Sequence, residues 1–304
     1  MNKLFCLFMC LPLSAADPGF DQALQQASRG DCAAAVETLS TLLKSGAPAG
    51  ADPYRLLAYC QSQLGQSAEA IRSVRAGLAR NPASPVLELA LGQLLLRQKP
   101  ENPEAGALLA RAAGALPRDP EARHYYAQWA YLNRRDSVCV QQETAALLLP
   151  GLNDVALLQM NTLLGMCASR MEAIPQAKAA FEGALAANER QAMFDPVSAY
   201  QYVQLLSRIG DEDAARRVTT QILSRAPAFA PALLEQAKQL DRAGHPEKAI
   251  EAAQAVLRGA NNDINTQRAA HMILAKSYTI LGNADAATRE QLWIEQHPNP
   301  ESPR

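Results

Sequence analysis

The feature that most constrains this chain is a short signature that returns at nearly constant intervals along its length. In its full form it is a glycine, four residues of any kind and then an alanine, as in Gly30 and Ala35. The eight copies of the alanine position are Ala35, Ala70, Ala105, Val140, Ala177, Ala215, Ala249 and Ala287. Successive copies lie 34 to 38 residues apart. A period of this length indicates a row of similar supersecondary units rather than a single globular core.

The residues around each copy predict two helices joined by a tight turn. A leucine often follows the alanine after eight residues and a proline after twelve, as Leu78 and Pro82 follow Ala70. Proline in that place ends a helix, because it has no N–H to donate. The 304 residues are 48% hydrophobic, mostly alanine and leucine, and long alternating runs of Val, Ile and Thr are absent. This composition favours helix over strand, and we expect an all-α protein.

At this level of detail the sequence resembles the tetratricopeptide repeat (TPR) family, whose unit is a helix–turn–helix of 34 residues. The clearest unit is "DPYRLLAYCQSQLGQSAEAIRSVRAGLARNPAS", which contains Gly65 and Ala70. Two units depart from the pattern: the third has a longer turn, "KPENPE", and the fourth has Arg135 at the turn and Val140 at the alanine position. The resemblance implies a right-handed superhelical solenoid of about eight units and a role in protein interaction without catalysis.

The repeat divides the sequence into a leader, an array and a tail. We expect a signal peptide over residues 1–16, a solenoid over 17–301 and a short polar tail over 302–304. The expected units cover residues 17–49, 51–84, 85–119, 120–154, 158–191, 196–229, 230–263 and 268–301. Extra residues near 155–157, 192–195 and 264–267 are expected to lengthen some helices or linkers.

The first residues have the form of a secretory signal. Lys3 precedes an apolar run of about ten residues, and small residues follow at Ser14, Ala15 and Ala16. The run is too short to span a bilayer, which takes about 20 residues. The alternative is a buried N-terminal helix. The signal interpretation predicts an exported protein, periplasmic or extracellular, with no membrane span.

The TPR resemblance implies a concave groove lined by the first helix of each unit, and hence a protein or peptide partner. Arg170, Arg208 and Arg242 all stand seven residues before the alanine position. The full set of candidate groove residues is Arg97, Tyr125, Trp129, Arg170, Tyr200, Arg208, Lys238, Arg242 and Lys276. Arginine binds carboxylates in a bidentate manner, so an acidic segment or the C-terminus of a polypeptide would suit this strip. The alternative is that a cation in the last turn simply favours the helix dipole, by about 0.3–1 kcal/mol.

Motifs for catalysis, cofactors and metals are absent from the sequence. The four histidines are scattered, and there is no glycine-rich phosphate loop and no Gly-x-Ser-x-Gly motif. The net charge of −1 gives no basic excess for nucleic acid. We therefore expect a scaffold with no cofactor and no catalytic or metal site. The alternatives are an accessory or regulatory subunit of an envelope enzyme or secretion complex, or a self-assembling structural solenoid. The sequence determines neither the partner nor the oligomeric state.

Four cysteines remain after the expected signal cleavage, and their spacing is regular. Cys32 and Cys60 are 28 residues apart, and so are Cys139 and Cys167. In a TPR stack the second helix of one unit packs against the first helix of the next, where these residues fall. We predict disulfides Cys32–Cys60 and Cys139–Cys167, which would require an oxidising compartment. The alternative is four buried thiols.

Overall fold

The computed structural model describes residues 18–45, 50–259 and 263–298. Across these described residues there are sixteen α-helices and no strand, which confirms the all-α prediction. The helices of residues 1–135 are α1 (Pro18–Ser28), α2 (Cys32–Lys44), α3 (Ala51–Gln63), α4 (Ser67–Arg80), α5 (Pro85–Gln98), α6 (Pro103–Ala115) and α7 (Pro120–Leu132). Those that follow are α8 (Asp136–Leu147), α9 (Asp154–Arg170), α10 (Ile174–Glu189), α11 (Pro196–Arg208), α12 (Glu212–Arg225), α13 (Ala230–Arg242), α14 (Pro246–Leu257), α15 (Ile264–Ile280) and α16 (Ala284–Gln296).

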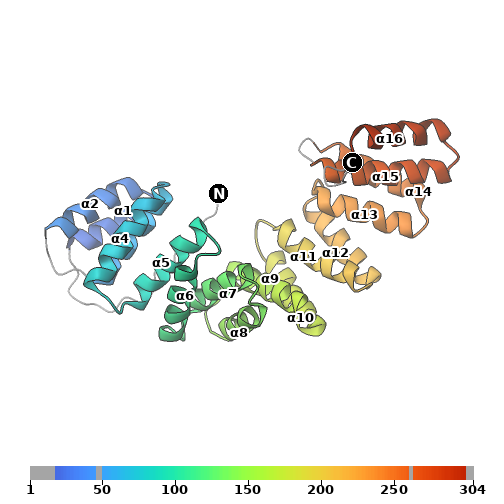
Figure 1. Ribbon diagram of the computed structural model, residues 1–304. Helices are drawn as coiled ribbons and strands as arrows, with labels where there is room; N and C mark the ends of the chain where they lie inside the picture. The colour runs from blue at the N-terminus through green and yellow to red at the C-terminus, as the bar shows by residue number, and fades with distance from the viewer. Residues whose placement is uncertain (1–17, 46–49, 260–262, 299–304) are drawn as a thin grey trace. The chain divides into compact units, whose positions relative to one another are not determined.

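The protein forms two compact units, residues 1–135 and 136–304. Within each unit, consecutive helices form helix–turn–helix pairs, and each pair packs against the next along the sequence (Figure 1). The division falls inside the fourth predicted repeat, between α7 and α8. The extra residues near 155 and 264 lengthen first helices, because α9 and α15 each have 17 residues. The leader predicted over residues 1–16 and the tail over 302–304 lie outside the described residues.

The turn inside every described repeat except the third contains one residue with positive φ, which glycine adopts without a steric cost. Gly30, Gly65, Gly210, Gly244 and Gly282 hold this place with φ between 72° and 83°. In the fourth and fifth repeats Arg134 and Glu172 adopt a φ of 58° in the same place. The fourth turn is therefore centred on Arg134, and the prediction of Arg135 was wrong by one residue.

The same shift moves the buried small residue of the fourth repeat. Five residues after the left-handed residue inside these repeat turns comes a fully or almost fully buried side chain, as at Ala35, Ala70 and Ala177. In the fourth repeat that side chain is Cys139, which has no exposed surface, whereas Val140 is half-buried. We call this place the anchor position. Its occupants are small because the first helix of the next repeat packs closely against it.

The helix starts are fixed by local chemistry. Asp or Asn side chains accept hydrogen bonds from the free N–H groups of the first turn, as Asp31 does from the Ala34 N–H at 3.0 Å. Asp119 caps α7 and Asp195 caps α11 in the same way. Proline stands at the start of several helices, including α5, α6 and α7, where its missing N–H costs nothing. These local signals set the helix bounds independently of the packing between repeats.

One of the two predicted disulfides is present. Cys139 on α8 and Cys167 on α9 are bonded, with their Cα atoms 6.3 Å apart. Cys32 and Cys60 are instead two buried thiols in the cluster that packs α1, α2 and α3 together. The physical reason is register: Cys139 is an anchor residue, whereas Cys32 precedes its anchor, Ala35, by three residues. Three residues are about 4.5 Å along a helix, so the two pairs are not equivalent.

Candidate peptide-binding groove

A groove of about 650 Å³ opens on the first helices of the second, third and fourth repeats. Its walls come from α3, α5 and α7, and the loop between α6 and α7 closes one edge. The floor is apolar and includes Leu56, Leu89 and Leu94, which are 2%, 7% and 8% exposed. The polar lining residues are Arg55, Tyr59, Ser62, Gln63, Gln93, Arg97, Arg118, Asp119, Glu121 and Tyr125. A volume of this size, apolar below and polar at the sides, is typical of a ligand site.

Glu121 lies in the first turn of α7 and projects into the groove. Its carboxylate accepts a hydrogen bond from the Gln93 side-chain amide of α5 at 3.1 Å. Glu121 is exposed as a residue, but its place in the groove removes part of the carboxylate from water. This partial desolvation and the neighbouring Asp119 carboxylate raise the pKa of Glu121 above its ordinary value. Asp119 itself accepts from the Glu121 and Ala122 N–H groups as the cap of α7.

Tyr125 follows Glu121 by one helical turn on α7 and is half-buried in the wall. Burial and the negative charge of Glu121 raise the pKa of Tyr125 to about 12, against a smaller opposing effect from Arg97. The phenol is therefore neutral across the physiological range. It offers an apolar ring with a hydroxyl that can donate to a peptide carbonyl.

Arg97 stands in the last turn of α5 and is exposed. Its Nη2 donates to the Ser62 hydroxyl of α3, so the guanidinium is held over the groove by a neutral acceptor. Arg97 and Tyr125 were both predicted as groove residues, and both line it.

The predicted cations of residues 136–304 are bonded within the protein instead. The Arg170 Nε donates to Asp136 Oδ1 at 2.8 Å, and Arg208 Nη2 donates to the Ser169 carbonyl at 2.9 Å. The Lys276 ammonium lies 2.8 Å from Asp241 Oδ2. Each of these contacts joins the end of one first helix to the preceding repeat. These contacts give the periodic cations a structural role. The binding of the cations to a partner stays a prediction.

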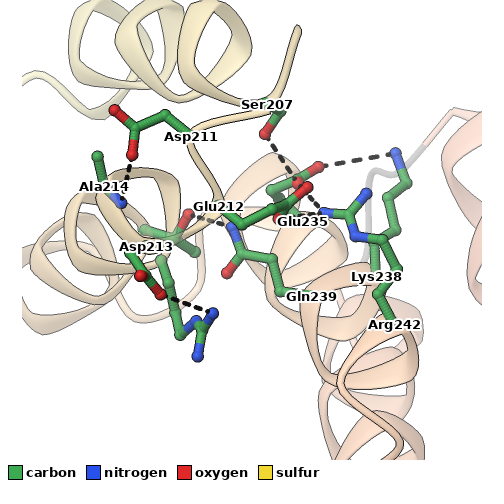
Figure 2. A network of polar contacts seen from close by, with 11 residues as sticks. Ser207, Asp211, Glu212, Asp213, Ala214, Glu235, Lys238, Gln239 and Arg242 are labelled. Carbon is green, nitrogen blue, oxygen red and sulfur yellow. Dashed lines mark hydrogen bonds and ion pairs between the residues drawn. The ribbon is translucent and has the colours of Figure 1, made fainter. Parts of the chain in front are cut away.

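The same holds for Lys238 and Arg242, which lie beside a nearly buried carboxylate. Figure 2 shows both side chains and Ser207 pointing toward Glu235, whose side chain is 8% exposed. Arg242 is 3.1 Å from Glu235 and 3.1 Å from Glu212, and Lys238 lies 4.0 Å from Glu235. A carboxylate removed from water needs such partners, so this network neutralises its own charges.

The two remaining predicted groove residues pack against their neighbours. Trp129 is 7% exposed, lies against Gly106 and donates its Nε1–H to the Asn102 carbonyl at 3.2 Å. It is a packing residue and does not line the groove. Tyr200 makes an edge contact with Phe229, with the ring centroids 5.9 Å apart. Burial and Glu235 raise the pKa of Tyr200 to about 12.

Gln93 and Glu121 were not predicted as groove residues, although the sequence contains a signal for both. Gln93 precedes Arg97 by four residues, and Glu121 precedes Tyr125 by four. Residues four apart lie on the same helix face, so stepping back one turn from each predicted residue would have found both. Arg55 and Tyr59 on α3 show the same spacing.

Comparison with known proteins agrees with this geometry at the level of the fold. No family model matches the sequence. No curated protein matches it either. Solved TPR structures do match. A tetratricopeptide repeat protein from Parabacteroides merdae has a TM-score of 0.55 and 13% identity, over 84% of this chain and 97% of that one. The protein has the TPR solenoid fold.

Two further structures share this fold. PilF from Pseudomonas aeruginosa has a TM-score of 0.51 and 18% identity, over 83% of this chain and 92% of that one. YrrB, a TPR protein with an unusual peptide-binding site, has a TM-score of 0.51 and 16% identity, over 64% of this chain and 96% of that one. In the part of the protein that the structure describes, none of the helices is long and apolar enough to cross a bilayer.

Proposed function

We propose that this protein is a non-catalytic, exported scaffold that binds an extended peptide segment of a partner in the groove of α3, α5 and α7. The groove carries the proposal, because it joins an apolar floor to polar side chains from three successive repeats. An extended segment can cross all three helices and use its alternate side chains on the floor and the walls. The TPR resemblance and the peptide-binding site of YrrB support this interpretation.

Export is proposed on two grounds. Residues 1–16 have the pattern of a secretory signal, although they lie outside the described residues. The bond between Cys139 and Cys167 supports an oxidising compartment, because structural disulfides are rare in reducing ones. We place the mature protein in a periplasm or outside the cell. Mass-spectrometric identification of the native N-terminus at Asp17 would test this, and a native protein that retains Lys3 would contradict it.

A displayed library of random peptides tests the groove. The library is selected on the wild-type protein and on Ala90→Arg, which places a long charged side chain among the groove-lining residues of α5. The control is Ala110→Arg, since Ala110 is equally half-buried on α6 but does not line the groove. We expect peptides enriched on the wild type and on Ala110→Arg to lose binding to Ala90→Arg by more than tenfold. If no peptide is enriched, or if both variants bind alike, the proposed function is wrong.

A further inference from the structure

The wall formed by α5 and α7 carries two opposite charges that form no ion pair among the described residues, although the Arg55 charge acts on Glu121 without pairing with it. Among the residues that the structure describes, Glu121 forms no ion pair, and its hydrogen-bond donor is the neutral Gln93 amide. Arg97 likewise donates to the neutral Ser62 hydroxyl. Arg55, which also lines the groove, is paired with Asp52 at 3.0 Å. Glu121 and Arg97 thus differ from Arg170, Arg242 and Lys276, whose charges are matched by carboxylates.

The two charges have a fixed order along the wall. The hydrogen bond from Gln93 to Glu121 sets these two residues opposite each other across α5 and α7. Arg97 and Tyr125 each lie four residues further along their own helix, about 6 Å on. The Tyr125 hydroxyl responds to the charges of both Glu121 and Arg97. The groove wall therefore carries the Glu121 carboxylate at one level and, one helical turn further along, the Arg97 guanidinium and the Tyr125 phenol.

A partner that covers this wall removes both charges from water. Such desolvation is unfavourable unless the partner supplies the opposite charge, and mismatched charges disfavour wrong partners strongly. An acidic segment would match Arg97 but would repel Glu121. A basic segment would match Glu121 but would repel Arg97.

We propose that the partner segment is dipolar: an extended peptide that sets a basic side chain against Glu121 and a carboxylate against Arg97, with an apolar side chain between them over the leucine floor. This inference rests on the proposed function and names the chemistry of its ligand. It narrows the acidic partner suggested by the periodic arginines to one that also carries a base.

The test uses synthetic fluorescein-labelled peptides of about ten residues. Each carries a lysine and a glutamate separated by one to three residues that include a leucine, in both orders along the peptide. Matched peptides replace the lysine, the glutamate or both by glutamine. Binding is measured by fluorescence anisotropy on the wild type, Glu121→Gln and Arg97→Gln. Glu101→Gln and Arg80→Gln serve as controls, because both residues are exposed and lie outside the groove. Circular dichroism melting verifies that Arg97→Gln, which loses the contact with Ser62, remains folded.

The expected result is a coupling between each peptide charge and its partner. Replacing the peptide lysine should weaken binding to the wild type by about 3- to 10-fold but leave binding to Glu121→Gln unchanged. Replacing the glutamate should weaken wild-type binding similarly but leave binding to Arg97→Gln unchanged. Equal losses in wild type and variants, tighter binding of the purely acidic peptide, or no binding of any probe would overturn the dipolar ligand. The proposed function would still stand in any of these cases if the random library yields peptides that Ala90→Arg loses.

Discussion

Ala35 and Cys139 hold the same place in their repeats, and this residue-level equivalence decides which thiols bond. Each follows the left-handed turn residue by five positions and is fully buried. Their neighbours in the next repeat, Cys60 and Cys167, also correspond, because each precedes its own anchor by ten residues. Cys32 lies three residues before its anchor, whereas Cys139 is itself an anchor. Both pairs are nevertheless 28 residues apart, because the anchors Ala35 and Ala70 are 35 residues apart and the anchors Cys139 and Ala177 are 38 apart.

It follows that moving one thiol by three residues should create the missing disulfide. In Cys32→Ala with Ala35→Cys, the new thiol should stand toward Cys60 as Cys139 stands toward Cys167, where the Cα atoms are 6.3 Å apart. We expect this double variant, produced without residues 1–16 and their two cysteines, to contain no titratable thiol when unfolded after air oxidation, whereas the matching wild type should contain two. Thiol titration in denaturant and intact mass provide the measurement. Two remaining thiols in the double variant would show that the first two repeats pack in a different register.

At the scale of the elements, neighbouring helices come together where a large side chain lies over a glycine. A Cβ on Gly106 of α6 would lie 2.3 Å from two ring carbons of Trp129 on α7, and one on Gly165 would lie 2.8 Å from Phe181. Atoms cannot approach so closely, so the absence of a side chain at these places sets the distance between the helices.

Two glycines of α6 offer a matched comparison. We expect Gly106→Ala to destabilise the N-terminal unit by about 1–3 kcal/mol, because the Trp129 ring must move. Gly114→Ala, on the same helix, should stabilise by about 0.5–1 kcal/mol, since nothing lies within 4 Å of its added methyl group. Urea unfolding followed by Trp129 fluorescence in a Trp293→Phe background measures both. Equal effects of the two substitutions would refute the glycine–tryptophan contact.

The helices could be predicted from the sequence because their signals are local. These signals are turn glycines, capping Asp and Asn residues and first-turn prolines, each of which acts within a few residues. Because the unit repeats, the same signals recur along the sequence and confirm one another. The hydrogen-bond partners of the periodic arginines could not be predicted, because these partners depend on the register between repeats. That register changes with the linkers, which vary the anchor spacing between 34 and 38 residues. Thus Arg170 reaches the Asp136 carboxylate of the preceding repeat, whereas Arg97 reaches a neutral acceptor there, the Ser62 hydroxyl.

At the scale of the whole molecule, a row of repeats transmits changes mainly between neighbours. Within each unit, a helix pair packs against the pairs next to it, and among the described helices no closed core joins distant repeats within a unit. Local free energies of opening therefore differ along the sequence, and a bond between two helices stabilises the repeats that contain them most.

The disulfide between α8 and α9 allows a direct test of this locality. Removing it with Cys139→Ala and Cys167→Ala should lower the opening free energy of α8 and α9 by about 3 kcal/mol, a rise of roughly a hundredfold in their amide exchange rates. The effect should fade through α10 and be absent from α1 to α4. Native-state hydrogen exchange read by mass spectrometry, on this variant and on Cys32→Ala with Cys60→Ala as the control, measures the profile. Exchange that accelerates uniformly over all the helices would mean that the array opens as one cooperative block, because only then does a single cross-link stabilise every repeat equally.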